Sequence, residues 1–95
     1  MDPRSANPID WDRRRAEELL FVIAAELRRI PMNERTKELH LRALRAKRDV
    51  TQWSRDPPAE PARLRSIEEL VRIHAEAERE RTRAVQTSRL ARRGP

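Results

Sequence analysis

Apolar residues recur at steps of three and four along most of the chain, the spacing that places side chains on one face of an α-helix. β-Branched residues are sparse and do not alternate with polar residues over the length of a strand. Ala, Leu, Glu and Arg, which are strong helix formers, dominate the composition. The pattern predicts an all-α protein with three helical segments, at about residues 9–30, 34–54 and 62–85.

The first segment is apolar on nearly every side. Its main stripe steps by four and three residues and comprises Ala16, Leu20, Ile23, Leu27 and Ile30. Other faces carry further apolar residues, namely Leu19, Phe21, Val22, Ala24 and Ala25. Such a helix is buried on more than one side, so its second side faces either another molecule or the chain's own helices. Either Asn7 followed by Pro8, or Asp10, would cap its start.

Pro31 separates the first segment from the second, because proline lacks a backbone donor and disfavours helical geometry at the preceding residue. Asn33 is a suitable cap for the helix that restarts after it. The main stripe of the second segment comprises Leu39, Ala43, Ala46, Val50 and Trp53. A second, shorter stripe contains Leu41 and Leu44, so this helix also has more apolar surface than one contact needs.

The proline-rich stretch 55–61 is expected to be a linker long enough to reverse the chain. The third segment begins near either Pro61 or Ser66, since residues 66–69 match the capping-box pattern. One of its stripes comprises Leu64, Ile67, Val71 and His74, and the neighbouring one comprises Leu70, Ile73 and Ala77.

These elements predict an antiparallel helical hairpin, with its first arm kinked at Pro31, that assembles as a dimeric helical bundle. A dimer is expected because only 37% of the 95 residues are hydrophobic, which gives a monomer a thin core. Residues 1–8 should form a flexible N-terminus, residues 9–78 a single helical domain, and residues 79–95 a basic, partly disordered tail. The residues expected to pack the hairpin and the dimer contact are Leu20, Ile23, Leu27, Leu41, Leu44, Ile67, Leu70, Val71 and His74.

Several classes of function find little support in the composition. The chain has no Cys, and its single Gly is Gly94, which excludes disulfide frameworks, thiolate metal sites and glycine-rich phosphate loops. His74 and Glu78 share a helix face, but a metal site needs three or four ligands. His40 and His74 are the only natural bases, and neither is placed beside a nucleophile. We therefore expect no enzyme, no metal and no cofactor.

The longest apolar run, Leu19–Ala25, is shorter than the roughly 20 residues that a membrane span needs. The start of the chain also lacks an apolar signal region. These features predict a cytoplasmic protein that contacts no membrane.

Positive charge is concentrated near the C-terminus. The net charge is +6, and residues 79–95 hold six Arg and one Glu, which leaves residues 1–78 almost neutral. A basic tail can attract nucleic acid, although a charged run is more often a solvated end. The segment 34–54 is also rich in Arg and Lys and follows a short turn, as in a helix-turn-helix. A small dimeric DNA-binding regulator that uses this helix or the Arg-rich tail is therefore an alternative.

Three blocks of the chain resemble the TraM-like antiactivators of quorum sensing in rhizobia and agrobacteria, including the QseM type. The first block is Ile30-Pro31 at the end of the first helix. The second has aliphatic residues at 39, 41 and 44, with Ala43, Arg45 and Arg48 at fixed spacings. The third is Arg65-Ser66-Ile67-Glu68, followed by Val71, Ile73 and His74-Ala75. The order of the blocks and the proline-containing connection agree over about residues 18–77.

The resemblance implies an all-helical, dimeric protein that binds a LuxR-type transcription activator and blocks its DNA binding, thereby repressing conjugal or mobile-element transfer genes. It implies no cofactor, no small-molecule substrate and no catalysis. Partner contact is expected at Phe21, Ile30, Pro31, Arg65 and Ser66. Two departures stand out: Ser66 replaces an aromatic residue of the family pattern, and the end of the chain is more basic. An adaptor hairpin with some other partner is a further alternative.

Overall fold

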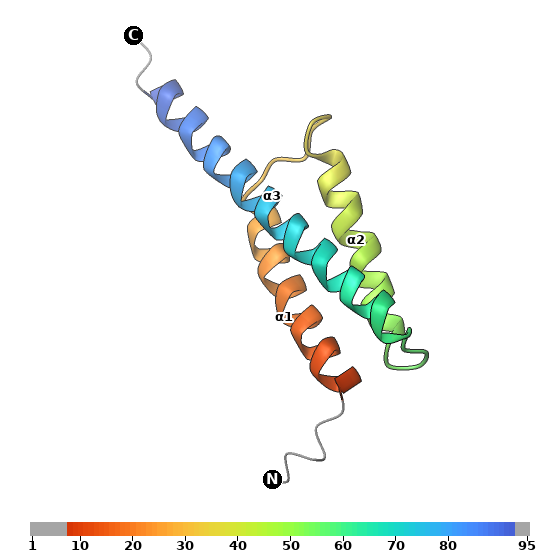
Figure 1. Ribbon diagram of the computed structural model, residues 1–95. Coiled ribbons are helices and arrows are strands. Elements are labelled where there is room, and N and C mark those ends of the chain that lie inside the picture. The colour runs from red at the N-terminus through yellow and green to blue at the C-terminus, as the bar shows by residue number, and fades with distance from the viewer. Residues whose placement is uncertain (1–7, 93–95) are drawn as a thin grey trace.

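The protein consists of three α-helices in a computed structural model that describes residues 8–92. Helix α1 spans Pro8–Leu27, α2 spans Lys37–Gln52 and α3 spans Glu60–Arg92 (Figure 1). No strand occurs within residues 8–92. The expected all-α class is confirmed. The flexible N-terminus expected for residues 1–8 lies outside the described residues, except for Pro8, which begins α1.

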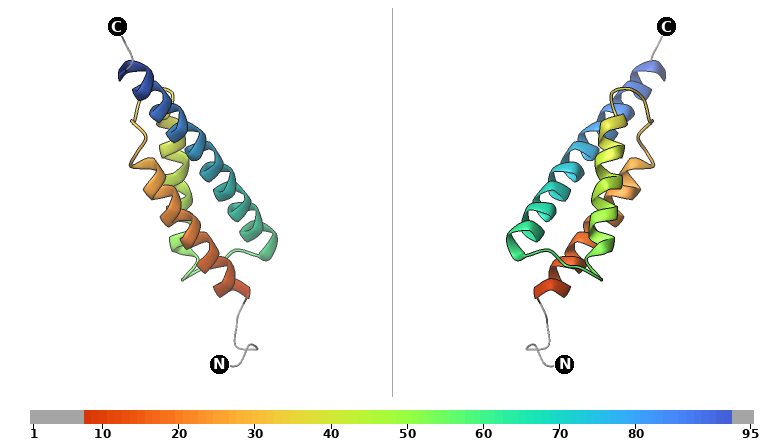
Figure 2. Two further views of the ribbon diagram at one scale, coloured as in Figure 1. Left: turned by 90° about the vertical axis from the view of Figure 1, so that its left-hand side faces the viewer. Right: turned by 90° about the vertical axis from the view of Figure 1, so that its right-hand side faces the viewer.

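The three helices run up, down and up, so that α2 is antiparallel to both α1 and α3 (Figures 1 and 2). All three pairs of helices are in contact. The expectation of a hairpin with one arm kinked at Pro31 is therefore wrong in one respect. The chain reverses direction around Pro31, and α2 packs beside α1 instead of continuing it.

The reversal is built from residues 28–36. Two short-range bonds, Arg29 N to Glu26 O (3.0 Å) and Ile30 N to Leu27 O (3.1 Å), close the end of α1. Asn33 Oδ1 then accepts bonds from the backbone N–H groups of Arg35 (2.9 Å) and Thr36 (3.0 Å). These bonds close the turn before α2, but α2 begins at Lys37 with Thr36 at its N-cap position, so the expectation that Asn33 caps this helix is wrong.

Thr36 fixes this turn in place. Its buried hydroxyl donates to the carbonyl of Pro31 (2.6 Å) and accepts a bond from Asn33 N (3.0 Å). This local network gives the Pro31 carbonyl and the Asn33 N–H hydrogen-bond partners within the turn. The loop is thereby a defined turn and not a hinge within one helix.

The core lies on the stripes that the spacing predicts for α1 and α2. Ala16 and Ile23 of α1 are buried, as are Leu39, Ala43 and Val50 of α2. Ile30 and Trp53, from the segments that follow these helices, complete the same cluster. On α3 the buried stripe is Ile67, Leu70, Ile73 and Ala77. It therefore follows the second of the two stripes expected there, joined by Ile67 of the first.

Helix α3 is longer at both ends than expected. It begins at Glu60, and Ser66 lies inside it with its hydroxyl donating to Asp49 of α2 (3.1 Å). The capping-box assignment is therefore wrong, and the earlier start near Pro61 is correct. Residues 79–85 are helical, as the third predicted segment had them, and the helix continues to Arg92, past its expected end near residue 85. Residues 93–95 of the expected basic tail lie outside the description. The last turns of α3 extend beyond the other helices (Figures 1 and 2).

Ion pairs join α3 to the other two helices. Arg63 is buried, and its Nε lies 3.0 Å from Asp12 of α1. Arg81 pairs with Glu26 of α1 further along. Arg42 of α2 binds both Glu69, at 2.5 Å from Nη2, and Glu76. The hydrogen bonds that Arg42 donates to Glu69 raise the pKa of Arg42 against the opposing effect of burial.

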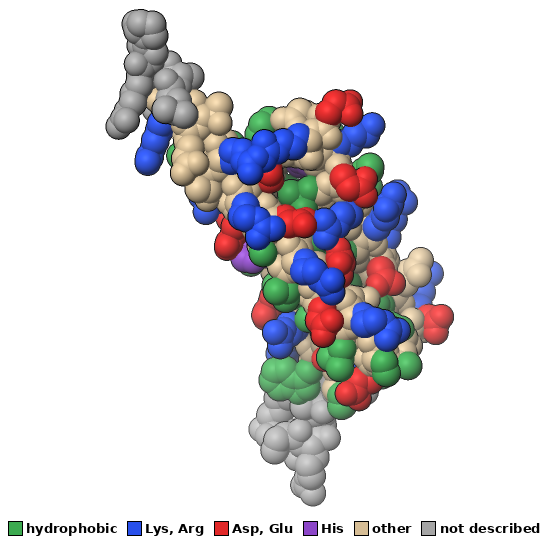
Figure 3. Space-filling model, turned by 45° about the horizontal axis from the view of Figure 1, so that its top comes forward, with side chains coloured by type: hydrophobic (Ala, Val, Ile, Leu, Met, Phe, Trp, Pro, Cys, Tyr) green, Lys and Arg blue, Asp and Glu red, His purple; other side chains and the backbone are tan. Residues whose placement is uncertain are grey.

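The surface mixes both signs of charge. Lys and Arg side chains alternate with Asp and Glu over the face of α2 and α3 in Figure 3. None of the helices within residues 8–92 has an apolar stretch of the length that crossing a bilayer requires.

Candidate protein-docking groove

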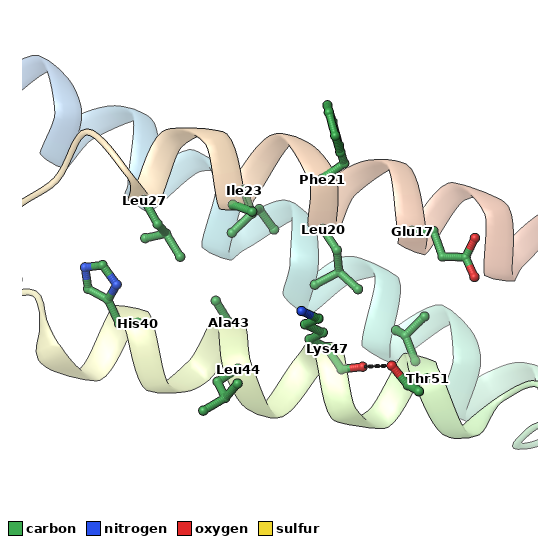
Figure 4. Close-up of a pocket in the computed structure, with 12 residues that line it drawn as sticks. Glu17, Leu20, Phe21, Ile23, Leu27, His40, Ala43, Leu44, Lys47 and Thr51 are labelled. Carbon is green, nitrogen blue, oxygen red and sulfur yellow. Dashed lines mark hydrogen bonds between the residues drawn. The ribbon is translucent and has the colours of Figure 1, made fainter.

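A groove of about 500 Å³ lies between α1 and α2, on the side turned away from α3 (Figure 4). Ala43 of α2 faces Ile23 of α1 across its floor. A methyl group is too short to fill the space between two helices, so the groove stays open at this level. Its lining consists of Glu17, Leu20, Phe21, Ile23, Ala24, Leu27, His40, Ala43, Leu44, Lys47, Val50 and Thr51.

The groove is mostly apolar and has exposed apolar rims. Phe21 projects from α1 away from α2, and 79% of its surface is exposed. Leu44 stands on α2 with 47% exposed. Single exposed apolar residues are common on protein surfaces, but an apolar groove with an exposed aromatic rim is typical of a site that binds another protein.

Four polar residues line the groove, and two of them are engaged within the chain. Thr51 donates its hydroxyl to the carbonyl of Lys47 (2.7 Å), and Glu17 lies 3.9 Å from Arg13. Lys47 has no ion-pair partner within residues 8–92. The Nε2 atom of His40 is buried without a hydrogen-bond partner in the structure. Within the described lining, the groove therefore has one cation without an ion pair, Lys47, and one ring nitrogen without a partner, the buried Nε2 atom of His40.

The structure does not bring the five residues expected for partner contact into one site. Phe21 lies at the groove, whereas Pro31 is exposed in the loop after α1. Arg65 is exposed near the start of α3, and Ser66 is bonded to α2. Ile30 is only 5% exposed and lies in the core. Its expected partner contact is wrong, because the chain reversal turns this side chain inward.

The residues expected to pack the hairpin and dimer fall into three groups. Ile23, Ile67 and Leu70 lie in the core, and Leu20 and Leu27 pack partly against it. His74 is half-buried, with Nε2 3.3 Å from Glu78. The exposed members are Leu41, Leu44 and Val71. These three are only partly covered within the chain, and their assignment to a contact between two chains stays a prediction.

Part of the basic face of α2 is paired within the chain, whereas no ion pair within residues 8–92 involves Lys37, Lys47 or Arg48. Arg42 binds Glu69 and Glu76, and Arg35 before the helix lies 3.1 Å from Glu80. Arg45 lies 4.0 Å from Glu38. Guanidinium groups that are already paired with carboxylates are poorly placed to bind phosphates, since each DNA contact would first break an ion pair.

Comparison with protein-family models, curated proteins and solved structures finds no match to this chain. Within residues 8–92 no three His, Asp or Glu side chains gather where they could hold a metal ion. The groove is therefore the feature of the described fold on which a function can be built.

Proposed function

We propose that this protein is an antiactivator, which binds a LuxR-type quorum-sensing transcription activator and prevents it from binding DNA. The observation that carries the proposal is the apolar groove between α1 and α2, with Phe21 and Leu44 exposed at its rims. The three sequence blocks that resemble TraM-like proteins support it. Repression of conjugal or mobile-element transfer genes would be the consequence in the cell.

The mechanism requires a difference in affinity and no chemical step. The antiactivator binds the DNA-free activator more tightly than the DNA-bound one, and this difference alone shifts the activator off its operator. Because linkage is reciprocal, operator DNA weakens binding of the antiactivator by the same factor. No residue has to imitate DNA, which agrees with the mixed charges of the surface.

We further infer a homodimer that forms through the outer face of α3. Leu64 and Val71 are seven residues apart, so they share one helix face, and both are about half exposed. This face lies on α3, whereas the groove lies on the side turned away from α3. A dimer formed there leaves both grooves free for the activator. Sedimentation of Val71→Glu should then give a monomer.

A DNA gel-shift tests the antiactivator function. A LuxR-type activator, its signal and its operator are mixed with increasing amounts of this protein, and a control lane holds this protein and DNA alone. The activator's shifted band should disappear while the control lane stays unshifted. Leu44→Glu, which places a charge on the apolar rim, should abolish the effect, and Val85→Glu on the far end of α3 should not.

Other results would contradict the proposal. A shift in the control lane would favour the DNA-binding regulator that the basic segment 34–54 and the Arg-rich end suggest. If neither lane changes with any LuxR-type activator of the source organism, the antiactivator function is wrong and an adaptor function is favoured.

A further inference from the structure

We propose that the groove binds a single amphipathic α-helix of about three turns from another protein, with acidic side chains beside its apolar stripe. One of these carboxylates pairs with Lys47. This inference rests on the proposed function, in which the groove is the docking site, and it specifies the shape and charge of the segment that binds there. Because its test uses no activator, a failure of this inference can be told apart from a failure of the antiactivator function.

The length of the groove sets the length of the bound segment. Its lining residues run from Glu17 to Leu27 on α1 and from His40 to Thr51 on α2. At a rise of 1.5 Å per residue, each wall is about 16 Å long, which corresponds to about three helical turns. A helix laid between α1 and α2, opposite α3, would complete a four-helix arrangement with apolar contacts on both sides of α1.

The chemistry of the walls favours a helix over an extended peptide. An extended segment brings unpaired N–H and C=O groups into the groove, and each unpaired group buried there is costly. The walls can pair few of them, because apolar residues dominate, the Thr51 hydroxyl is already bonded to Lys47 O, and in the described lining only Lys47 and the buried Nε2 atom of His40 lack partners. A helix satisfies its own backbone and presents only side chains to the groove, as in other helix-in-groove complexes.

The charges around the groove favour an acidic partner. Lys47 extends from α2 toward α1 in Figure 4 and has no ion-pair partner within residues 8–92. Arg28 follows the α1 wall directly, Lys37 precedes the α2 wall, and both are exposed. The single carboxylate of the lining, Glu17, lies beside Arg13. A bound helix with acidic flanks meets complementary charge, whereas a basic one is repelled.

A second copy of this chain does not supply such a helix. The end of α3 extends beyond the other helices, and past Arg81, which still pairs with Glu26 of α1, its described charged side chains are Arg83 and Arg89. This segment is basic and carries few large apolar residues, so it fits neither the apolar floor nor the charge of the rims. The occupant is therefore a different protein.

The test titrates the full-length protein with a labelled 18-residue peptide built from Leu, Ala and Glu. Its leucines stand at i, i+3, i+4 and i+7 spacing, and its glutamates flank that stripe. The affinity is followed by fluorescence anisotropy, and the location by the amide NMR shifts of ¹⁵N-labelled protein. We expect the shifts to cluster in residues 17–27 and 40–51.

Two pairs of variants decide whether the groove makes the contact. Leu44→Glu should weaken binding about tenfold or more, because it buries a charge against the apolar stripe. Val85→Glu, which adds the same charge on the end of α3, should change the affinity less than about twofold. Equal losses in the two variants would overturn the groove as the site.

The second pair uses a charge exchange. Lys47→Glu should weaken the acidic peptide about fivefold and strengthen a version with Lys in place of Glu, whereas the neighbouring Arg48→Glu should do so less. Arg48 is not part of the lining. Equal effects would show general attraction to a protein of net charge +6 and would overturn the Lys47 contact.

The remaining outcomes also discriminate. If the peptide does not bind and Leu44→Glu converts a dimer into a monomer, the groove is covered by a second copy and the proposal is wrong. If the peptide binds as expected but the gel-shift shows no inhibition, the helix-binding groove stands and the antiactivator function falls.

Discussion

Helix α1 has two sides that differ sharply. The side that faces α3 is closed: Ala16 is buried in one cluster with Leu70, Ile73 and Ala77. Ion pairs with α3, from Asp12 and Glu26, lie near both ends of this contact. The side that faces α2 is open at the groove, and no ion pair joins the side chains of α1 and α2 within residues 8–92.

The difference shows how so small a protein can combine stability with a binding surface. Burial of apolar surface is the main contribution to the stability of a fold, and it is largest where side chains interdigitate closely. Concentrating close packing between α1 and α3 lets the α1–α2 side keep exposed apolar residues without losing the fold. We therefore expect stability to depend on the closed side and binding to depend on the open one.

The largest expected effect is at the centre of the closed side. Leu70 has no exposed surface, and Leu70→Ala should lower the free energy of unfolding by about 3–4 kcal/mol, because it removes transfer energy and leaves a cavity. Leu44→Ala, the same change on the open rim, should alter it by less than about 0.5 kcal/mol. Urea unfolding followed by circular dichroism measures both. Comparable losses would mean that the two sides contribute equally.

The spacing of apolar residues predicts this closed core well. The stripe of α2 appears as expected, and so do Ala16, Ile23 and Leu70, because a buried helix face requires a step of three or four residues. The spacing does not predict which of two apolar stripes on one helix is buried in the core. On α3 both Leu64–Val71 and Leu70–Ala77 are possible faces. The choice depends on neighbours distant in sequence, such as the Arg63–Asp12 ion pair.

The chain reversal and the groove could not be predicted from the spacing of apolar residues either. Pro31 indicates a break, but a kink and a reversal both satisfy it, and the difference lies in the Thr36–Pro31 hydrogen bond. The groove arises because Ala43 faces Ile23 across two helices. Phe21 was expected to contact a partner and lines the groove, whereas Lys47 was expected only as one basic residue of the candidate DNA-binding segment 34–54.

A smaller effect is expected at the end of the closed side. Arg63 is buried and bonds both Asp12 and the carbonyl of Pro58 (2.7 Å). Arg63→Ala should lower the free energy of unfolding by about 2–3 kcal/mol, because Asp12 and the Pro58 carbonyl lose their partner in a half-buried place. Arg35→Ala, which breaks a more exposed pair with Glu80, should cost less than about 1 kcal/mol.

This prediction is measured by chemical unfolding of Arg63→Ala, of Arg35→Ala and of the double variant that combines Arg63→Ala with Asp12→Ala. The double variant should recover part of the loss, since it removes the carboxylate that is otherwise left unpaired. A loss in Arg35→Ala as large as that in Arg63→Ala would show that the position of an ion pair relative to the closed side does not matter.

The smallest effect on stability is expected at Phe21, and it sharpens the comparison most. With 79% of its surface exposed, Phe21→Ser should change the free energy of unfolding by less than about 0.5 kcal/mol, because little contact is lost within the chain. Its effect on binding should be large, since exposed aromatic residues at a groove are the usual anchors of an interface. The acidic helical peptide and the activator in the gel-shift should both bind at least about tenfold more weakly. If Phe21→Ser unfolds the chain instead, the open side of α1 is required for stability. Its exposed apolar residues then do not serve mainly to bind a partner.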